Sequence, residues 1–279
     1  MRGGAIVALD SSFLDQLAAV TGARHVATDE ESRERASFDA FGPRRFPHTS
    51  PLAEARVDAV ARPASTAEVS AIARLANEHR VPLIPYGGGT GVMGGVVPLR
   101  GGVSVDMRRM SAVLDVRRAD RLARAQSGAY LADLEAAALA NGLMLGHDPW
   151  SVPVATVGGA ISTDGVGYRA SKYGSMGDQV RALEVVLADG TVARTRPLPR
   201  QSAGPRLNGL FVGAEGSMGI ITEATVELFP QPETRAFLTF GFGGFEAGHP
   251  AARRLFDIGL TPSLIELTEE AEPMARGFL

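Results

Sequence analysis

A run of glycines at residues 85–95, PYGGGTGVMGG, is the part of the sequence best suited to hold an anion. Successive backbone N–H groups in turn-like conformations converge on a concave site, and glycine permits both positive φ angles and close approach of a ligand. A simple tight turn between strands is the alternative, but such a turn needs one or two glycines. The run therefore predicts a phosphate-binding loop.

The same run contains Gly89-Thr90-Gly91-Val92-Met93-Gly94, which matches the G-x-G-x-x-G pattern of nicotinamide-type dinucleotide folds. That pattern requires a helix that begins at the loop and directs its N-terminus at a pyrophosphate. Here the next residues, VMGGVVPLRGGVSVDM, include four more glycines and a proline. Each interior glycine costs a helix roughly 1 kcal/mol and a proline about 3 kcal/mol. We therefore predict that the match is accidental and that no helix follows the loop.

Two further segments rich in glycine, at 148–174 and 213–221, also follow apolar runs. A ligand that carries a pyrophosphate and flat rings needs hydrogen-bond donors from several loops, with apolar walls between them. Three unrelated turns are the alternative, but we predict that the three loops form one site. Together they supply small hydroxyl side chains at Thr90, Ser151, Thr156, Ser162, Thr163 and Ser217.

Strands and helices must position these loops. Ser65-Thr66-Ala67-Glu68 is a capping-box pattern, and it precedes a helix with Val69, Ile72, Ala73 and Ala76 on one face. Asp189-Gly190 is a type I′ turn signal within a hairpin at 181–195. We predict further helices at 11–22 and at 130–142, the second ended by Gly142. Strands are predicted at 57–62, 81–86, 103–107, 112–118, 121–128 and 222–230. We also predict a long irregular segment at 143–180, a short helix or strand from 210, and a strand–helix–strand unit at 237–270.

Composition limits the class of protein. The chain has 279 residues, no cysteine and a formal net charge of −3, with 45% hydrophobic and 21% charged residues. The lack of cysteine excludes disulfides, thiolate catalysis and any cysteinyl bond to a cofactor. The charge pattern does not favour nucleic-acid binding. No apolar run approaches the roughly 20 residues of a membrane helix, and the first residues lack the layout of a signal peptide, so a cytoplasmic location is the default expectation.

At this point the sequence resembles a known family. PYGGGTG, then DPWSVPVATVGGAISTDGVGYRASKYG, then VGAEGSMGIITEATVEL are similar to the FAD-binding domain of the vanillyl-alcohol oxidase / p-cresol methylhydroxylase (PCMH-type) superfamily. Within it the likeness is greatest to the glycolate oxidase and D-lactate dehydrogenase group and to alkyl-dihydroxyacetonephosphate synthase. The resemblance runs from about Val57 to Pro230. It implies an α+β fold in which two α/β subdomains enclose an extended FAD.

The resemblance also assigns residues to the cofactor. It implies that the first loop wraps the FAD pyrophosphate, that the second lines the ribityl chain and the isoalloxazine edge, and that the third meets the adenine side. The residues expected to bind FAD are Pro85, Tyr86, Gly87, Gly88, Gly89, Thr90, Gly91, Gly94, Asp148, Pro149, Ser151, Ala155, Thr156, Gly158, Gly159, Ser162, Thr163, Gly165, Tyr173, Gly174, Glu215, Gly219, Ile220 and Ile221. Some relatives attach flavin through a histidine in the first loop; threonine stands there in this sequence, so we expect non-covalent FAD.

Two residues are candidates for a catalytic role. Lys172 is the sole lysine and lies within SKYG; a cation near the flavin would stabilise its anionic reduced form, although a solvated lysine is an equal alternative. His147 precedes Asp148-Pro149 and could act as a base or cap a loop. Trp150 could line the ring pocket or fill the core. For Arg169 we expect an exposed position in the loop, with contact to a substrate carboxylate as the alternative. His25, His48, His79 and His249 lack metal-ligand spacing, and we expect no metal.

These observations favour an FAD-dependent oxidoreductase that oxidises a small 2-hydroxy acid such as D-lactate or glycolate. One alternative is an FAD transferase similar to alkylglycerone-phosphate synthase, without net redox change; another is a non-catalytic flavin-binding fragment. We expect an N-terminal helical arm at 1–55, the FAD domain at 56–234 and the incomplete start of a cap domain at 235–279. A segment this short seldom holds its own core, so we expect a truncated member, or one that needs a partner chain to supply the cap.

Overall fold

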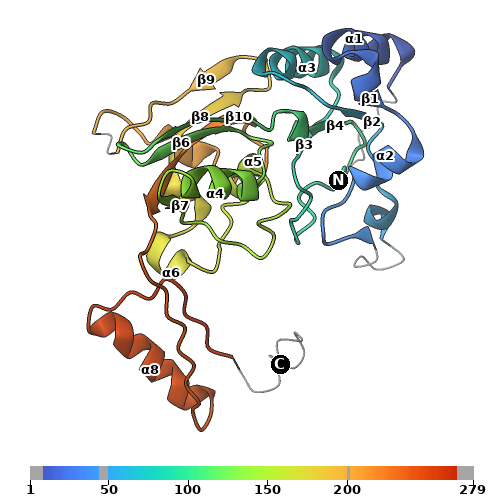
Figure 1. Ribbon diagram of the computed structural model, residues 1–279. Coiled ribbons are helices and arrows are strands. Elements are labelled where there is room, and N and C mark those ends of the chain that lie inside the picture. The colour runs from blue at the N-terminus through green and yellow to red at the C-terminus, as the bar shows by residue number, and fades with distance from the viewer. Residues whose placement is uncertain (1–8, 44–49, 200–201, 269–279) are drawn as a thin grey trace.

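The computed structural model describes residues 9–43, 50–199 and 202–268. The chain forms two neighbouring lobes, each built on a β-sheet, and a C-terminal segment that extends away from them (Figure 1). His48 and residues 269–279 lie outside the described residues. Two sheets with helices packed on them confirm the predicted α+β fold.

The first lobe contains a four-stranded sheet in the order β1-β2-β4-β3. Strands β2, β4 and β3 run parallel, and β1 pairs with β2 in the antiparallel sense. Helices α1 and α3 pack on this sheet around a core that includes Phe13, Leu17, Ile72 and Val105. The elements of this lobe are α1 (Ser11–Thr21), β1 (Val26–Ala27), α2 (Glu30–Arg35), β2 (Ala59–Ala61), α3 (Thr66–His79), β3 (Leu83–Tyr86) and β4 (Val103–Asp106).

Local sequence signals explain the helix boundaries in this lobe. Ser65 is the N-cap of α3, and its hydroxyl accepts a hydrogen bond from the Glu68 N–H at 3.2 Å. The Glu68 carboxylate accepts a hydrogen bond from the Ala64 N–H at 2.9 Å, whereas a capping box would use the N–H of the N-cap residue Ser65. The four residues predicted for its apolar face are all buried. No helix follows β3, as predicted. Residues 87–102 form turns and bends, with one isolated bridge between Leu99 and Gly101.

The second lobe contains a six-stranded antiparallel sheet. Its central strand is β10, which pairs with β6 on one side and β8 on the other, and also with β7 near its C-terminal end. Helices α4 and α5 pack against this sheet over a core of Leu131, Leu134, Ile161 and Leu228. The elements are β5 (Val113–Arg117), β6 (Leu122–Gln126), α4 (Leu131–Leu139), β7 (Leu143–Leu145), α5 (Val157–Ser162), α6 (Ala170–Tyr173), α7 (Met176–Gln179), β8 (Val180–Val186), β9 (Val192–Arg194) and β10 (Ile220–Pro230).

The sequence prediction was wrong in two details of this lobe. Residues 143–180 are not wholly irregular, because they contain β7, α5, α6 and α7. The β8–β9 hairpin forms, but its turn is not type I′, which requires a positive φ at both central residues. Gly190 has φ +81° whereas Asp189 is not among the residues with positive φ. The bonds from Gly190 N–H to Leu187 O and from Leu187 N–H to Thr191 O instead define a three-residue loop with glycine in the left-handed position.

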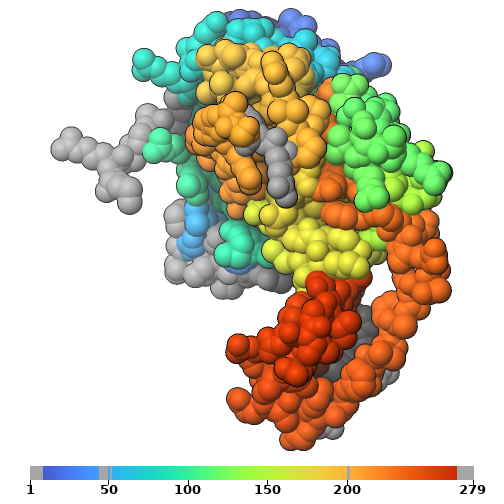
Figure 2. All heavy atoms as spheres, turned by 90° about the vertical axis from the view of Figure 1, so that its left-hand side faces the viewer, coloured from blue at the N-terminus to red at the C-terminus, as the bar shows by residue number. Residues whose placement is uncertain are grey.

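The segment after β10 departs from the lobes and carries α8 (Phe245–Asp257). Figure 2 shows it projecting from the body of the molecule and passing back toward it at its end. The predicted helix is confirmed, but neither flanking strand forms among the described residues up to 268. Residues 237–244 and 260–268 pair with no other strand there, and an extended segment without a ladder partner is not stable as a strand. Single-turn 3₁₀ helices elsewhere lie at Ala23–His25, Pro51–Glu54, Met107–Arg109 and Leu207–Leu210.

Candidate functional site

The first glycine loop forms a cradle of bare backbone at the end of β3. None of the backbone N–H groups from Gly87 to Gly91 donates a hydrogen bond to another described residue. A side chain at Gly88 would collide with the Val154 carbonyl, and one at Gly89, whose φ is +65°, would collide with the Tyr86 hydroxyl. Five consecutive unpartnered donors, four of them on glycines whose positions leave no room for a side chain, are suited to form a concave anion nest.

The N-terminal segment holds this loop from the outside. The Asp39 carboxylate accepts hydrogen bonds from the Gly94 N–H at 3.0 Å and from the Phe41 N–H at 2.9 Å. The Tyr86 hydroxyl donates to the Arg35 carbonyl at 3.2 Å. Burial raises the pKa of Tyr86, so this hydroxyl remains a donor at neutral pH. Residues 35–41 therefore fix the shape of the glycine loop.

The second loop faces the first across a cavity. Thr156 is the N-cap of α5, and its hydroxyl accepts the Gly159 N–H at 3.3 Å. Gly158 lies so close to Ser127 that a Cβ at position 158 would be 2.6 Å from the Ser127 Cβ. The Ser127 hydroxyl is buried and has no hydrogen-bond partner in the part of the chain that the structure describes. Such an orphaned group at a cavity wall is a candidate for bonding to a ligand.

The third loop closes the cavity between β10 and the first lobe. Glu215 has φ +47°, a left-handed conformation that is strained for a residue with a side chain. Its N–H donates to the Ser162 carbonyl at 2.9 Å, which ties the third loop to α5. Gly216 packs against Pro85, where a Cβ would be 2.6 Å from the Pro85 Cγ. All three loops thus meet, as the sequence analysis predicts.

The cavity that they enclose measures about 500 Å³, within the range of small-molecule sites. Its charged lining consists of three carboxylates, Asp39, Asp164 and Glu215, and no arginine or lysine from the described residues lines it. An anionic ligand would therefore be held by backbone donors rather than by side-chain cations. Apolar walls come from Met107, Val166, Ile220 and Ile221.

His147 lines the same cavity and is almost fully buried, with 3% of its surface exposed. Its Nδ1 has no hydrogen-bond partner within residues 9–43, 50–199 and 202–268. Burial lowers the pKa of His147 from 6.5 to about 4, against a smaller opposing effect of Asp148. The imidazole is therefore neutral at pH 7, and Gly165 packs against it, with its Cβ position 3.2 Å from Cε1. A pKa this far below neutral makes the ring a weak base, so it suits hydrogen bonding to a ligand better than proton abstraction.

Arg169 belongs to the second loop and is not a surface arginine. Its side chain is 15% exposed and its Nε donates to the Asp148 carboxylate at 2.8 Å. Its Nη1 bonds to the Leu145 carbonyl at 3.1 Å and lies 3.8 Å from the Glu135 carboxylate. Because these contacts join β7, α4 and the second loop, Arg169 positions the loop that carries His147.

Most residues predicted to bind the cofactor line the cavity, and His147 lines it with them. The lining members of that prediction are Pro85, Tyr86, Gly87, Gly88, Gly89, Thr90, Gly91, Pro149, Ser151, Ala155, Thr156, Gly158, Gly159, Ser162, Thr163, Gly165, Glu215, Gly219, Ile220 and Ile221.

Five other predicted residues lie outside this lining. They are Gly94, Asp148, Lys172, Tyr173 and Gly174. Lys172 is exposed on α6, and its Nζ is 5.5 Å from the centroid of the Tyr173 ring. Trp150 is 78% exposed, contrary to a core role. Trp150 lines a separate hollow with Tyr168, Ser171 and residues 264–266 of the C-terminal segment.

Sequence reasoning missed several residues of the cavity. Asp39 comes from the N-terminal segment, which carried no recognisable motif. Ser127 follows β6, and Met107 follows β4, so each lies at the end of a strand, the position where site residues commonly occur. Asp164 lies within the second loop and has φ +47°, which the sequence alone does not reveal. The end of a strand followed by a small polar residue was the available signal for Ser127.

Comparison with known proteins agrees with this geometry. Residues 57–196 match the family described as "FAD binding domain". The chain is 34% identical, over 92% of its length, to the glycolate oxidase subunit GlcD of Bacillus subtilis (strain 168), of which the match covers 53%. It is 38% identical, over 78% of its length, to a D-lactate dehydrogenase of Archaeoglobus fulgidus, of which the match covers 50%.

A solved structure of an alkyldihydroxyacetonephosphate synthase shares the fold. It superposes with a TM-score of 0.71 at 31% identity, over 81% of this chain and 45% of that one. The chain thus spans about half the length of the relatives it matches. Within the part of the chain that the structure describes, no helix combines the length and apolar character needed to cross a membrane.

Proposed function

The chain belongs to the FAD-binding domain family, and from that premise we propose that it is part of an FAD-dependent oxidoreductase acting on a small 2-hydroxy acid. The observation that carries the proposal is the cavity between the three loops, with the unpartnered N–H groups of Gly87 to Gly91 at one wall. Two of the relatives described above are named for the oxidation of glycolate and D-lactate, which are both small 2-hydroxy acids.

The residues present fit FAD by their chemistry. A pyrophosphate requires several donors, and the glycine loop offers five in sequence, four of them on residues without a side chain. The carboxylates in the cavity suit hydroxyl groups such as those of a ribose or ribityl chain, because a carboxylate only accepts hydrogen bonds. The buried Ser127 hydroxyl and His147 Nδ1 lack partners among the described residues, and a flat heteroaromatic ring offers such partners.

Bound FAD supplies an acceptor for the hydride that leaves the carbon bearing the substrate hydroxyl. Around it, this chain contributes binding, orientation and exclusion of water. His147 holds a neutral imidazole against the cavity, and Arg169 fixes the loop on which His147 lies. The first loop has threonine at position 90 and no histidine to which a flavin could be attached, which supports a non-covalent cofactor. Lys172 remains a proposed electrostatic partner, with the test that Lys172→Ala would alter the flavin reduction potential.

A second candidate is a transferase in which FAD participates without net redox change. The observation that favours it is the superposition on alkyldihydroxyacetonephosphate synthase, whose identity with this chain is close to that of the oxidases. The two candidates make opposite predictions for the flavin spectrum, since only the oxidoreductase is reduced by a hydroxy acid.

Anaerobic mixing of the flavin-loaded protein with D-lactate or glycolate distinguishes them. We expect loss of the visible flavin absorption with one of these acids and not with L-lactate, and recovery of the absorption when oxygen or an artificial acceptor is added. If added dithionite bleaches the flavin but neither acid does, the assignment to small 2-hydroxy acids is wrong for this protein. Bleaching by neither acid, together with a change of spectrum on adding an acyl-glycerone phosphate, would favour the transferase.

A further inference from the structure

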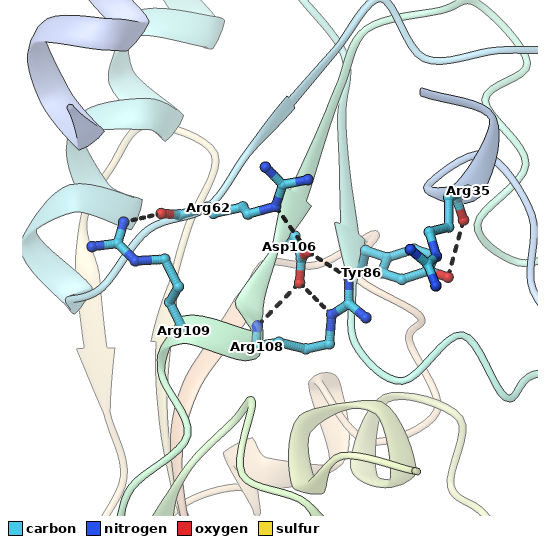
Figure 3. A network of polar contacts seen from close by, with 6 residues as sticks. All are labelled: Arg35, Arg62, Tyr86, Asp106, Arg108 and Arg109. Atoms are coloured by element: carbon cyan, nitrogen blue, oxygen red, sulfur yellow. Dashed lines mark hydrogen bonds and ion pairs between the residues drawn. The ribbon is translucent and has the colours of Figure 1, made fainter. Parts of the chain in front are cut away.

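A second polar site lies on the far side of Tyr86 from the cofactor cavity. Asp106, at the end of β4, is buried and receives two hydrogen bonds from the Arg108 guanidinium, at 2.8 and 2.7 Å. The Arg62 Nε lies 3.5 Å from the same carboxylate. Figure 3 shows Arg62 and Arg108 on either side of Asp106, with the Tyr86 ring and Arg35 beyond Arg108.

Three guanidinium groups face one hollow of about 200 Å³, which Arg35, Arg62 and Arg108 line together with Ser32. Arg35 forms no side-chain hydrogen bond or ion pair with another described residue, and the two terminal nitrogens of Arg62 are also without such a partner. The three arginines and the buried Asp106 carry a net charge of about +2, and Glu31, which also belongs to the lining, lowers it to about +1. Glu31 and Arg35 are both exposed at the rim.

Excess arginine around a small hollow is the arrangement that binds phosphate. A guanidinium presents paired N–H donors in a planar fork that matches phosphate oxygens, and it does not lose its charge in a protein. A phosphate monoester carries about −1.5 to −2 charge near pH 7, opposite in sign to the lining, and its oxygens accept from several guanidinium N–H groups at once.

Tyr86 connects this hollow to the cofactor cavity because it lines both. The Arg108 guanidinium lies 5.5 Å from the Tyr86 ring centroid, and the Tyr86 hydroxyl bonds to the carbonyl of Arg35. On the other side, the same hydroxyl occupies the space that a side chain at Gly89 would need. An anion that fixes Arg35 and Arg108 would therefore also fix the tyrosine on which the glycine loop rests.

We propose that the hollow lined by Arg35, Arg62 and Arg108 is a phosphate-binding site separate from the FAD cavity, and that its occupation strengthens FAD binding through Tyr86. The ligand is a small molecule that presents a phosphate group, either inorganic phosphate or a phosphate monoester. The effect on FAD is positive because the anion removes repulsion among the arginines and orders residues 35–39, which support the glycine loop. By linkage, FAD strengthens phosphate binding by the same factor.

The first test is calorimetric titration of the FAD-loaded protein with inorganic phosphate and, separately, with glycerol 3-phosphate, at constant ionic strength. We expect saturable binding that falls at least tenfold in Arg62→Gln and in Arg35→Gln, and not in the surface control Arg253→Gln. Arg35→Gln removes a side chain without partners, so it tests the site even if Arg62→Gln disturbs the fold. Tighter binding of the monoester would identify a metabolite as the ligand; equal binding would identify inorganic phosphate.

Two results would overturn the proposal. One is phosphate binding that is absent, that is matched by chloride at equal ionic strength, or that is unchanged in both arginine variants. The other comes from titrating FAD into flavin-free protein, with flavin fluorescence as the signal. We expect phosphate to tighten FAD binding severalfold in the wild type and not in Arg35→Gln. If phosphate instead weakens FAD binding in competition, the anion enters the FAD cavity and the hollow is not a separate site.

Discussion

Acidification should weaken the fold through His147. Burial at the cavity lowers the pKa of this histidine from 6.5 to about 4. As the pH falls below 6.5, the unfolded chain takes up a proton at His147, whereas the folded chain takes it up only near pH 4. The unfolded state binds more protons throughout this window, so the free energy of unfolding decreases as the pH falls from 6.5 to 4.

The size of the effect follows from the pKa shift. At 1.36 kcal/mol per pKa unit, the full displacement corresponds to about 3 kcal/mol. At pH 5 the unfolded chain is almost fully protonated at His147 and the folded chain is not, so about 2 kcal/mol should be lost relative to pH 7.5. This is a large part of the stability of an ordinary domain.

Urea unfolding of flavin-free protein at pH 7.5 and pH 5 measures this loss. The wild type should lose about 2 kcal/mol more than His147→Gln between the two pH values, because the variant lacks the titrating group. His249→Gln, which replaces an exposed histidine on α8, should behave as the wild type. If the wild type and His147→Gln lose the same stability to within about 0.5 kcal/mol, the burial of a neutral imidazole at the cavity is the wrong explanation.

Other predictions concern the loops around the cavity. Gly88→Ala places a methyl group 3.0 Å from the Val154 carbonyl carbon and against its oxygen, so it should reduce FAD affinity at least tenfold by fluorescence titration. Gly209→Ala, which has open space around it, should leave FAD affinity unchanged. Equal FAD affinity in the two variants would contradict the role of the glycine loop as a cradle. Arg169→Gln removes the ion pair with Asp148 and should lower the free energy of unfolding by about 1–3 kcal/mol, measured in urea; a change below about 0.5 kcal/mol would mean that the pair is only a surface contact.

Local signals predicted the glycine loop, and the family resemblance supplied most of the residues that line the cavity. The cost of glycine and proline correctly excluded a helix after Gly91. The same rule concealed α5, whose first turn contains Gly158 and Gly159. There the close approach of Gly158 to Ser127 and the Thr156 cap offset the weak helix propensity of glycine, because tertiary packing decides the outcome for a short helix.

Contacts between distant segments were not predictable from one sequence. Asp39 bonds to Gly94 across 55 residues, and neither residue has a pattern that indicates the other. Likewise the alternating segments at 237–244 and 262–268 have the composition of strands but no partner strand among the described residues. Strand formation depends on such a partner, and the sequence of a segment does not state whether one is present.

The visible absorption spectrum of the purified protein, before and after acid precipitation, tests the central claim most directly. A cavity of backbone donors and buried orphan groups that holds FAD without a covalent bond predicts flavin absorption bands that move to the supernatant on precipitation. Colour that stays with the pellet would contradict the non-covalent cofactor. A colourless protein that also takes up no added FAD would contradict the assignment of the cavity to FAD.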